Sequence, residues 1–213
     1  MTRSSSLHPF TSKAVPHALR VGALLLLGAL PAAAQEIKLD LNTRTTIEKM
    51  MDSLRALGLS DSVLRSKTFE GIQKRVDTKR LVEGVRAKFN LLLSAYSVLG
   101  TVDAGELDAA SSVLAAGAKP NQLAAFKPRQ KGRSDLVALT IWADLLSRGV
   151  PAEDASSAIA KLWQEGAEPA VFRRLWSEVQ GDISQGLSPG AAFQARVRET
   201  PPRPTKPVTP PEG

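Results

Sequence analysis

The chain has 213 residues, 43% of them hydrophobic, and a formal net charge of +7; this length is enough for one domain with a sizeable core. It contains no cysteine, and both histidines, His8 and His17, lie in the first 34 residues. If the first 34 residues are removed, the remaining chain has neither histidine nor cysteine. It can then form no disulfide, Ser-His-Asp triad, cysteine nucleophile or His/Cys metal site. Removal of the first 34 residues also takes away three of the 28 Lys and Arg residues and no acidic residue. The remaining chain has 25 basic and 21 acidic residues, a net charge of +4. Such a mild surplus indicates a mixed-charge surface and no nucleic-acid partner.

Residues 1–34 have the pattern of a secretory signal peptide. Three basic side chains come first, an apolar run VGALLLLGAL follows at 21–30, and small residues at 32–34 form a cleavage site. An apolar run of this length is too short to span a bilayer, which needs about 20 residues. We therefore expect a periplasmic or secreted bacterial protein that has no transmembrane span after cleavage.

From residue 35 to 199, apolar residues recur in steps of three and four, which is typical of amphipathic helices. We expect helices over 45–57, 60–76, 77–99, 103–116, 134–148, 151–165, 168–185 and 188–199, with a brief helical turn at 120–126. No segment alternates with a period of two, so no sheet is expected. The predicted fold is all-α: a compact bundle or short stack of about seven to eight helices.

Local signals refine this prediction. The spacing of Thr45 and Glu48 is that of a capping box, so the first helix should begin there. Gly84 lies inside the longest helix, where it costs about 1 kcal/mol relative to Ala, and a close helix crossing would explain it. Phe69 belongs to an apolar stripe of the second helix. Apolar residues cover most of the circumference of 134–148, which should therefore be the most buried helix.

Four joints between helices share a Gly followed two or three residues later by Pro: GAKP (117–120), GVP (149–151), GAEP (166–169) and GLSP (186–189), with a looser copy, GLSD, at 58–61. Gly supplies the left-handed residue that ends one helix, and Pro presets the first turn of the next. We interpret these Gly-x-x-Pro segments as tight turns. Beyond the helical domain at 35–199, residues 200–213 hold six of the 14 prolines and should form a disordered, extended tail.

A segment of the chain resembles uncharacterised exported bacterial all-helical proteins. Their motif is roughly Gly-Leu-Pro, then Lys-x-x-Glu-Gly before a Lys-rich turn, and the matching residues here are Gly58, Leu59, Lys67, Glu70 and Gly71. Ser60 stands where the motif usually has Pro. The resemblance covers most of residues 55–195. It implies an all-helical fold and an envelope location, and it implies no activity.

Two sets of residues are candidates for a site. Lys67 and Glu70 form a possible functional pair, because a lysine beside a carboxylate can act as a base or nucleophile, although the ordinary interpretation is a surface ion pair on one helix. A possible anion-binding loop, which could contact anionic lipid or a cell-wall polymer, contains Lys127, Arg129, Lys131 and Arg133. Trp142, Trp163, Trp176 and Tyr96 lie within apolar stripes and are expected to pack in the core.

Other patterns are explained by structure alone. Ser188 lies in a G-x-S-x-G sequence, but no strand precedes it and no histidine follows, so a helix N-cap is expected. Carboxylates cluster at Asp103, Glu106 and Asp108, at Glu153 and Asp154, and at Glu178 and Asp182. The first two clusters lie in first turns of helices, where negative charge complements the helix dipole. Neither pattern implies a metal or another cofactor.

The sequence favours a non-enzymatic interaction or structural protein of the bacterial envelope that binds another envelope protein through a groove or face between its C-terminal helices. One alternative is a carboxylate-dependent enzyme acting on cell-wall glycan, because such chemistry needs no histidine. A second alternative is a basic envelope-binding module that uses residues 127–133 and the tail.

Overall fold

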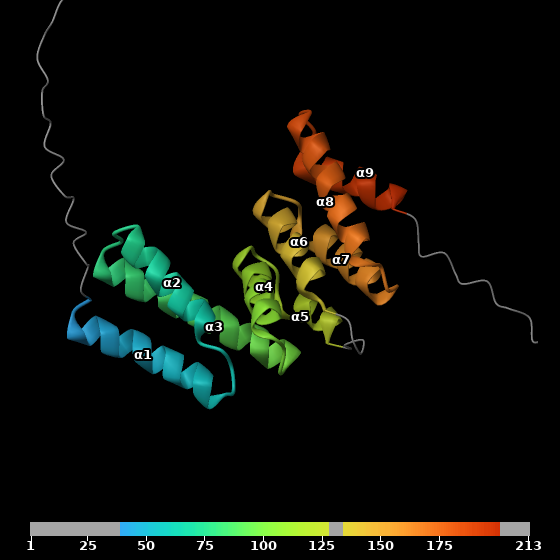
Figure 1. Ribbon diagram of the computed structural model, residues 1–213. Coiled ribbons are helices and arrows are strands. Elements are labelled where there is room, and N and C mark those ends of the chain that lie inside the picture. Colours follow the sequence, from blue (N-terminus) through green and yellow to red (C-terminus); the bar gives the residue numbers. More distant parts are fainter. Residues whose placement is uncertain (1–38, 128–133, 201–213) are drawn as a thin grey trace, which may run out of the picture. The chain divides into compact units, whose positions relative to one another are not determined.

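The computed structural model describes residues 39–127 and 134–200, and every regular element in them is helical (Figure 1). The described residues belong to one compact unit. The prediction of an all-α fold without a sheet is therefore confirmed for this part of the chain. The predicted signal peptide at 1–34, most of the basic loop and all of the tail beyond Thr200 lie outside the described residues.

Nine α-helices and one 3-10 helix follow one another in the described residues: α1 (Leu41–Ala56), α2 (Ser62–Gln73), α3 (Thr78–Leu99), α4 (Ala104–Ala115), α5 (Pro120–Leu123), η1 (Ala124–Phe126), α6 (Leu136–Ser147), α7 (Ala152–Gln164), α8 (Pro169–Ser184) and α9 (Pro189–Glu199). Most expected helices are present within a few residues of their predicted ends. The short α5 and η1 together form the helical turn expected at 120–126.

The start of α1 differs from the prediction. Asp40 is the N-cap, and its carboxylate accepts hydrogen bonds from the Thr43 amide at 2.9 Å and the Thr43 hydroxyl at 2.6 Å. The Thr45 hydroxyl instead donates to the Leu41 carbonyl inside the helix. The capping-box prediction at Thr45 was wrong because another capping residue, Asp40, lies five residues earlier and satisfies the Thr43 amide.

The predicted glycine joints are confirmed, and they share one hydrogen-bond pattern. Gly58, Gly117, Gly149, Gly166 and Gly186 all have positive φ. After each of them, the next amide donates to the carbonyl five residues earlier, as from Val150 to Leu145 at 3.1 Å. This is the Schellman arrangement, which satisfies carbonyls at the end of a helix. At three joints Pro begins the next helix, whereas Pro151 is the N-cap residue of α7.

A sixth joint of the same kind has no glycine. Arg75 has φ of 52°, its amide donates to the Ile72 carbonyl, and the Val76 amide donates to the Gly71 carbonyl five residues earlier. Arg75 therefore occupies the left-handed position that glycine holds elsewhere. This conformation is uncommon for a side chain as large as arginine.

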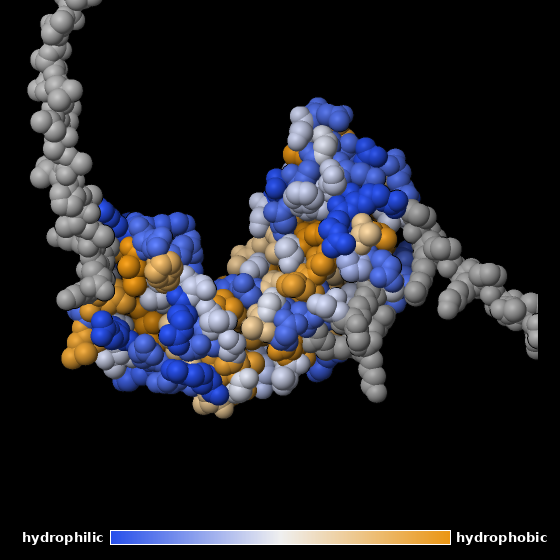
Figure 2. Space-filling model, viewed as in Figure 1, coloured by the Kyte–Doolittle hydropathy of each residue, from blue (hydrophilic) through white to orange (hydrophobic). Residues whose placement is uncertain are grey.

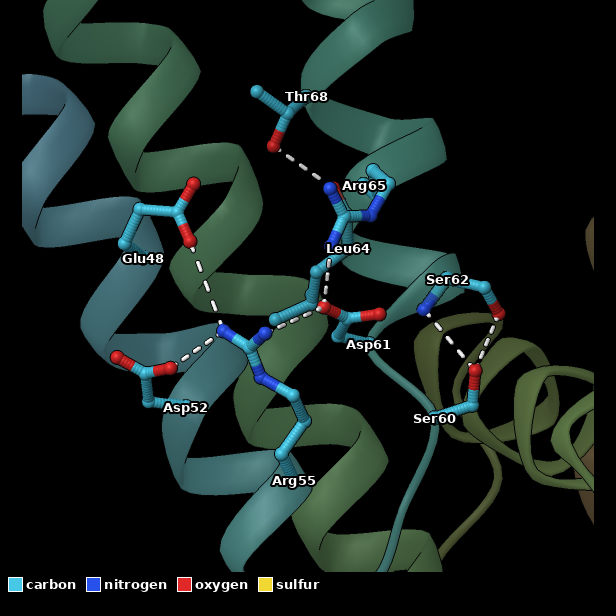
Figure 3. Close-up of polar contacts among 9 residues, drawn as sticks. All are labelled: Glu48, Asp52, Arg55, Ser60, Asp61, Ser62, Leu64, Arg65 and Thr68. Atoms are coloured by element: carbon cyan, nitrogen blue, oxygen red, sulfur yellow. Dashed lines mark hydrogen bonds and ion pairs between the residues drawn. The ribbon is translucent and has the colours of Figure 1, made fainter.

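At the joint of α1 and α2, one arginine contacts three carboxylates (Figure 3). Arg55 lies in the last turn of α1. Its guanidinium nitrogens are 2.5 Å from a carboxylate oxygen of Asp52 and 3.7 Å from those of Glu48 and Asp61. Asp61 is the N-cap residue of α2, but its carboxylate makes no cap hydrogen bond and instead pairs with Arg65 at 2.7 Å. The network thus connects the end of α1 to the start of α2.

Two helices organise the packing. Helix α3 contacts α1, α2, α4 and α5, and helix α6 contacts α4, α7 and α8. Leu139, Trp142 and Leu145 of α6 are fully buried, which agrees with the prediction that this helix is the most buried. The Trp142 ring stacks on Phe126 with centroids 5.6 Å apart, and Phe126 also contacts Trp163 at 5.1 Å.

Two expectations about packing were wrong. The Phe69 side chain, which the sequence places in the apolar stripe of the second helix, is 61% exposed. A Cβ on Gly84 would meet nothing within 4 Å, so no helix crosses closely there. The close approach is instead at Gly71, where a Cβ would lie 2.5 Å from Cδ1 of the buried Leu81. The sequence shows which helical positions lack a side chain but not which of them faces a neighbouring helix.

Candidate functional site

A groove with a volume of about 720 Å³ lies between α2, α3 and α4. In the view of Figure 2, the surface is hollowed between α2 and α4 and carries both hydrophilic and hydrophobic residues. The lining consists of Ser62, Val63, Ser66, Lys67 and Glu70 from α2, Gly84, Ala87, Lys88 and Leu91 from α3, and Asp108, Ser112 and Ala115 from α4. Charged side chains therefore face the groove from all three helices.

The α2 wall carries one carboxylate between two lysines. Glu70 lies 3.2 Å from the Lys67 ammonium and 2.5 Å from the Lys74 ammonium. Their spacing on the helix, three and four residues from Glu70, places all three side chains on one face. The hydrogen bonds from Lys74 and Lys67 hold the pKa of the Glu70 carboxyl below its ordinary value, so the Glu70 carboxylate stays ionised at neutral pH.

The opposite wall contains a more enclosed ion pair. Lys88 of α3 lies 2.6 Å from the Asp108 carboxylate of α4, and its side chain is only 17% exposed. The same ammonium donates to the Ser111 hydroxyl at 2.7 Å and approaches the Ser112 hydroxyl at 3.5 Å. These contacts connect α3 to α4 and fix the position of the lysine.

The floor of the groove is made of small residues. Gly84 and Ala87 of α3 and Ala115 of α4 expose little more than backbone and methyl groups to it. Because a Cβ on Gly84 would meet open space, the missing side chain leaves room in the groove. A larger residue at position 84 would project into this room.

The groove continues along α2 and α3. A neighbouring hollow of about 250 Å³ shares Lys67, Glu70 and Gly84 with it. Its other lining residues are Gly71, Lys74, Val76, Arg80, Leu81 and Val85. The two hollows therefore form one path along α3, from Arg80 to Leu91.

The structure brings the predicted pair Lys67 and Glu70 together in this groove. Of the other residues in the family-like motif, Gly58 ends α1 with φ of 73° and Leu59 is buried. Gly71 faces Leu81 at the close crossing of α2 and α3. Three of the five motif residues thus shape the helices, and two line the groove.

The predicted anion-binding loop falls largely outside the described residues. Lys127 is described and exposed, directly after η1. Arg129, Lys131 and Arg133 belong to the range 128–133, of which the structure gives no description. Binding of lipid or polymer by this loop stays a prediction.

The predicted carboxylate clusters have several structural roles. Asp103 caps α4, and Glu106, which is only 4% exposed, accepts hydrogen bonds from the Ser134 hydroxyl and the Asp135 amide at the start of α6. Asp182 accepts two hydrogen bonds from Arg196, at 2.6 and 2.7 Å, which connect α8 to α9. In the described part of the chain, no three His, Cys, Asp or Glu side chains are grouped so that they could hold a metal ion.

The predicted tryptophans and Ser188 behave mostly as expected. Trp142 and Trp163 are buried, and Trp176 is half-buried with its indole nitrogen donating to Asp144. Ser188 accepts from the Ala191 amide at 3.4 Å and caps α9, as predicted.

A smaller groove lies between α7 and α9, where the sequence favoured a binding face between C-terminal helices. Its volume is about 420 Å³, and Asp154, Lys161 and Arg198 line it together with Phe193 and Val197. A hydrogen bond of 3.0 Å from Gln194 to Asp154 connects its two helices. The larger groove beside α2 was missed because its second wall comes from α4. The sequence signals for it are the predicted pair Lys67 and Glu70 and the position of Lys88 one helical turn after Gly84.

No family model, curated protein or solved structure matches this chain. Among the described helices, none is both long and apolar enough to cross a membrane.

Proposed function

We propose that this chain is a non-enzymatic, exported protein of the bacterial envelope that binds a segment of another envelope protein in the groove between α2, α3 and α4. The observation that carries the proposal is the groove itself, with ion-paired walls and a floor left open at Gly84. Charged side chains around an open floor suit recognition of a polar partner.

The charge states of the carboxyl groups favour binding over catalysis. The pKa values of Asp40, Glu70, Asp144 and Asp182 are shifted from their ordinary values. All four pKa values are lowered; burial acts to raise that of Asp144, but hydrogen bonds from Trp176 and Arg148 outweigh it. A glycan-cleaving enzyme needs a carboxylic acid with a raised pKa that can donate a proton. None of these four carboxyl groups therefore suits the role of proton donor, and we place the glycan enzyme second.

Partner binding can be tested in intact cells by a photo-crosslinking amino acid placed at Ala87, which is exposed and lines the groove. The matched control position is Ser184, exposed on α8 and not part of the groove lining. We expect a discrete crosslinked product from position 87 and none of the same size from position 184.

The same experiment needs a variant that fills the groove. Gly84→Met should abolish the product, whereas Gly181→Met, at a helical glycine of α8 that also has open space around its Cβ position, should leave it intact. Equal crosslinking from positions 87 and 184, or a product unaffected by Gly84→Met, would contradict the proposal.

Export has a separate test. The signal-like pattern at 1–34 leads us to expect that protein isolated from the periplasm or medium begins at Gln35. N-terminal sequencing of that fraction measures this directly. Recovery of the intact chain in the cytoplasm alone would remove the envelope location.

A further inference from the structure

We infer that the segment bound in the groove between α2, α3 and α4 is an acidic peptide in extended conformation. This inference rests on the proposed function and adds the chemistry of the partner. It is carried by the surplus of positive charge along the groove and by the composition of its floor.

Cations outnumber carboxylates in the lining of the two connected hollows. The cations are Lys67, Lys74, Arg80 and Lys88, and the carboxylates are Glu70 and Asp108. Arg80 also pairs at 3.3 Å with Asp77, which lies outside the lining, so one positive charge still remains in excess.

This excess is concentrated on the α2 side. Lys67 and Lys74 both contact the same carboxylate, Glu70, which can balance only one of them. Both lysine side chains are well exposed, at 46% and 67%, so either can turn toward a ligand at little cost. Lys88 is different, because Asp108 and Ser111 hold it in place. It can act on a ligand only through long-range electrostatic attraction. Carboxylates of a partner would therefore meet exposed cations on α2 and at Arg80.

The shape of the path fits a short peptide. From Arg80 to Leu91 helix α3 rises about 17 Å at 1.5 Å per residue, which matches about five residues of extended chain at 3.3 Å each. Small and aliphatic residues line the path between the charged walls: Gly84, Val85, Ala87 and Leu91. An extended peptide presents its side chains to opposite faces, so apolar residues can face the floor while acidic residues face the lysines.

The lining argues against a sugar polymer. None of the described residues that line the two hollows is aromatic. Sugar rings are commonly held by stacking on aromatic side chains, and such a platform is missing from this path. The hydroxyls of Ser62 and Ser66 can instead bond to peptide groups.

The inference can be tested with fluorescent peptides added to the purified chain as the cell processes it. The probes are two pentapeptides, Glu-Val-Glu-Val-Glu and its neutral analogue with Gln in place of Glu. We expect the acidic peptide to bind at least tenfold more tightly than the neutral one, with an affinity that falls as salt is raised. Equal affinities, or binding of the acidic peptide that salt does not weaken, would overturn the inference.

Charge-matched variants locate the site. Lys67→Gln with Lys74→Gln should weaken the acidic peptide at least fivefold. Lys49→Gln with Lys79→Gln removes the same charge at exposed residues outside the two hollows and should change the affinity less than twofold. Gly84→Met should block binding without altering charge, and Gly181→Met should not. Equal losses in both charge variants would mean nonspecific attraction and would overturn the inference.

Two competitors separate the classes of ligand. An excess of unlabelled acidic peptide should displace the probe, whereas soluble peptidoglycan fragments should not. Displacement by the glycan fragments alone would overturn the inference. If the acidic peptide fails to bind while crosslinking at position 87 persists in cells, the acidic-peptide inference fails and the proposed function stands. If both fail, the proposed function fails as well.

Discussion

Helices α2 and α3 use their charged residues differently from helices α6 to α9. On α2, Glu70 pairs with Lys67 and Lys74 of the same helix, so these ion pairs hold no two helices together. In α6 to α9 the acids connect helices. The carboxylate of Asp135, the N-cap residue of α6, accepts from the Trp163 indole at 2.7 Å, and Asp182 of α8 accepts from Arg196 of α9. The ion pairs of Glu70 therefore lie at the surface and, unlike the pair of Lys88 with Asp108, connect no helices, whereas Asp135 and Asp182 use their charges between helices.

The two regions also differ in how well local sequence and structure agree. At the joints before α7, α8 and α9 a glycine adopts positive φ, whereas the joint between α2 and α3 places Arg75 in that conformation. Phe69 of α2 is left 61% exposed. Proteins tend to keep such locally unfavourable choices near functional surfaces. This contrast agrees with a binding role for the groove beside α2 and a supporting role for α6 to α9.

The largest loss of stability is expected from the aromatic cluster between η1, α6 and α7. Trp163 is 2% exposed and contacts Phe126, so Trp163→Ala should lower the free energy of unfolding by about 3–5 kcal/mol. Trp163→Phe keeps an aromatic ring at this position but loses the indole hydrogen bond to Asp135. It should lower the free energy of unfolding by less than the alanine variant does. Urea denaturation measures both values. A loss below 1 kcal/mol for Trp163→Ala would contradict the supporting role of this cluster.

Two helical glycines near the groove should respond in opposite directions. Gly71→Ala places a Cβ 2.5 Å from Leu81 Cδ1 and should destabilise the chain by about 1–2 kcal/mol after the gain in helix propensity. Gly84→Ala meets open space and should stabilise it by about 1 kcal/mol. Thermal unfolding of the two variants beside the unmodified chain gives the signs. Stabilisation by both substitutions would mean that α2 and α3 do not cross closely at Gly71.

The ion pair between α8 and α9 should make part of the stability depend on pH. Hydrogen bonds from Arg196 lower the pKa of Asp182 from its ordinary value of 3.8. A lowered pKa stabilises the fold above the unfolded value, and this contribution is lost as pH falls through the folded value. The effect should be modest because the Arg196 side chain is 32% exposed and solvent screens it.

The corresponding measurement compares the unmodified chain with Asp182→Asn. The difference in Tm between them should be widest near pH 7 and should close below about pH 3.8, the unfolded value. Other acids titrate in both proteins and cancel in the difference. A gap that is constant from pH 7 to pH 3 would show that the carboxylate charge contributes nothing.

Much of the fold could be predicted from the sequence because its signals are local. Helical periodicity and the glycine joints depend on residues within one or two turns of one another, and they gave the order of the helices and most of their ends. The start of α1 was misplaced because Thr45 and Asp40 both satisfy a cap pattern, and only the folded chain shows which is used. The sequence also showed a glycine inside α3 at position 84, but it did not show that a Cβ at this residue would meet open space.

The candidate site could be predicted only in part, for the same reason. Lys67 and Glu70 are three residues apart, so their pairing follows from helix geometry. Lys88 and Asp108 are twenty positions apart on different helices, and no local pattern indicates that they meet at 2.6 Å. Buried contacts such as that of Glu106 with the start of α6 were missed in the same way, because a first-turn acid usually serves its own helix.

The smallest expected effect is at the joint between α2 and α3, where Arg75 stands in place of glycine. Arg75→Gly should stabilise the chain by about 0.5–1 kcal/mol, because relief of the left-handed backbone outweighs the added freedom of the unfolded chain. Arg148→Gly is the control, since Arg148 has φ of −89° and should lose stability instead. Chemical denaturation resolves changes of this size when the two variants are measured together. If Arg75→Gly is neutral or destabilising, the arginine side chain stabilises the α2–α3 joint. The two regions would then differ only in how they use their ion pairs.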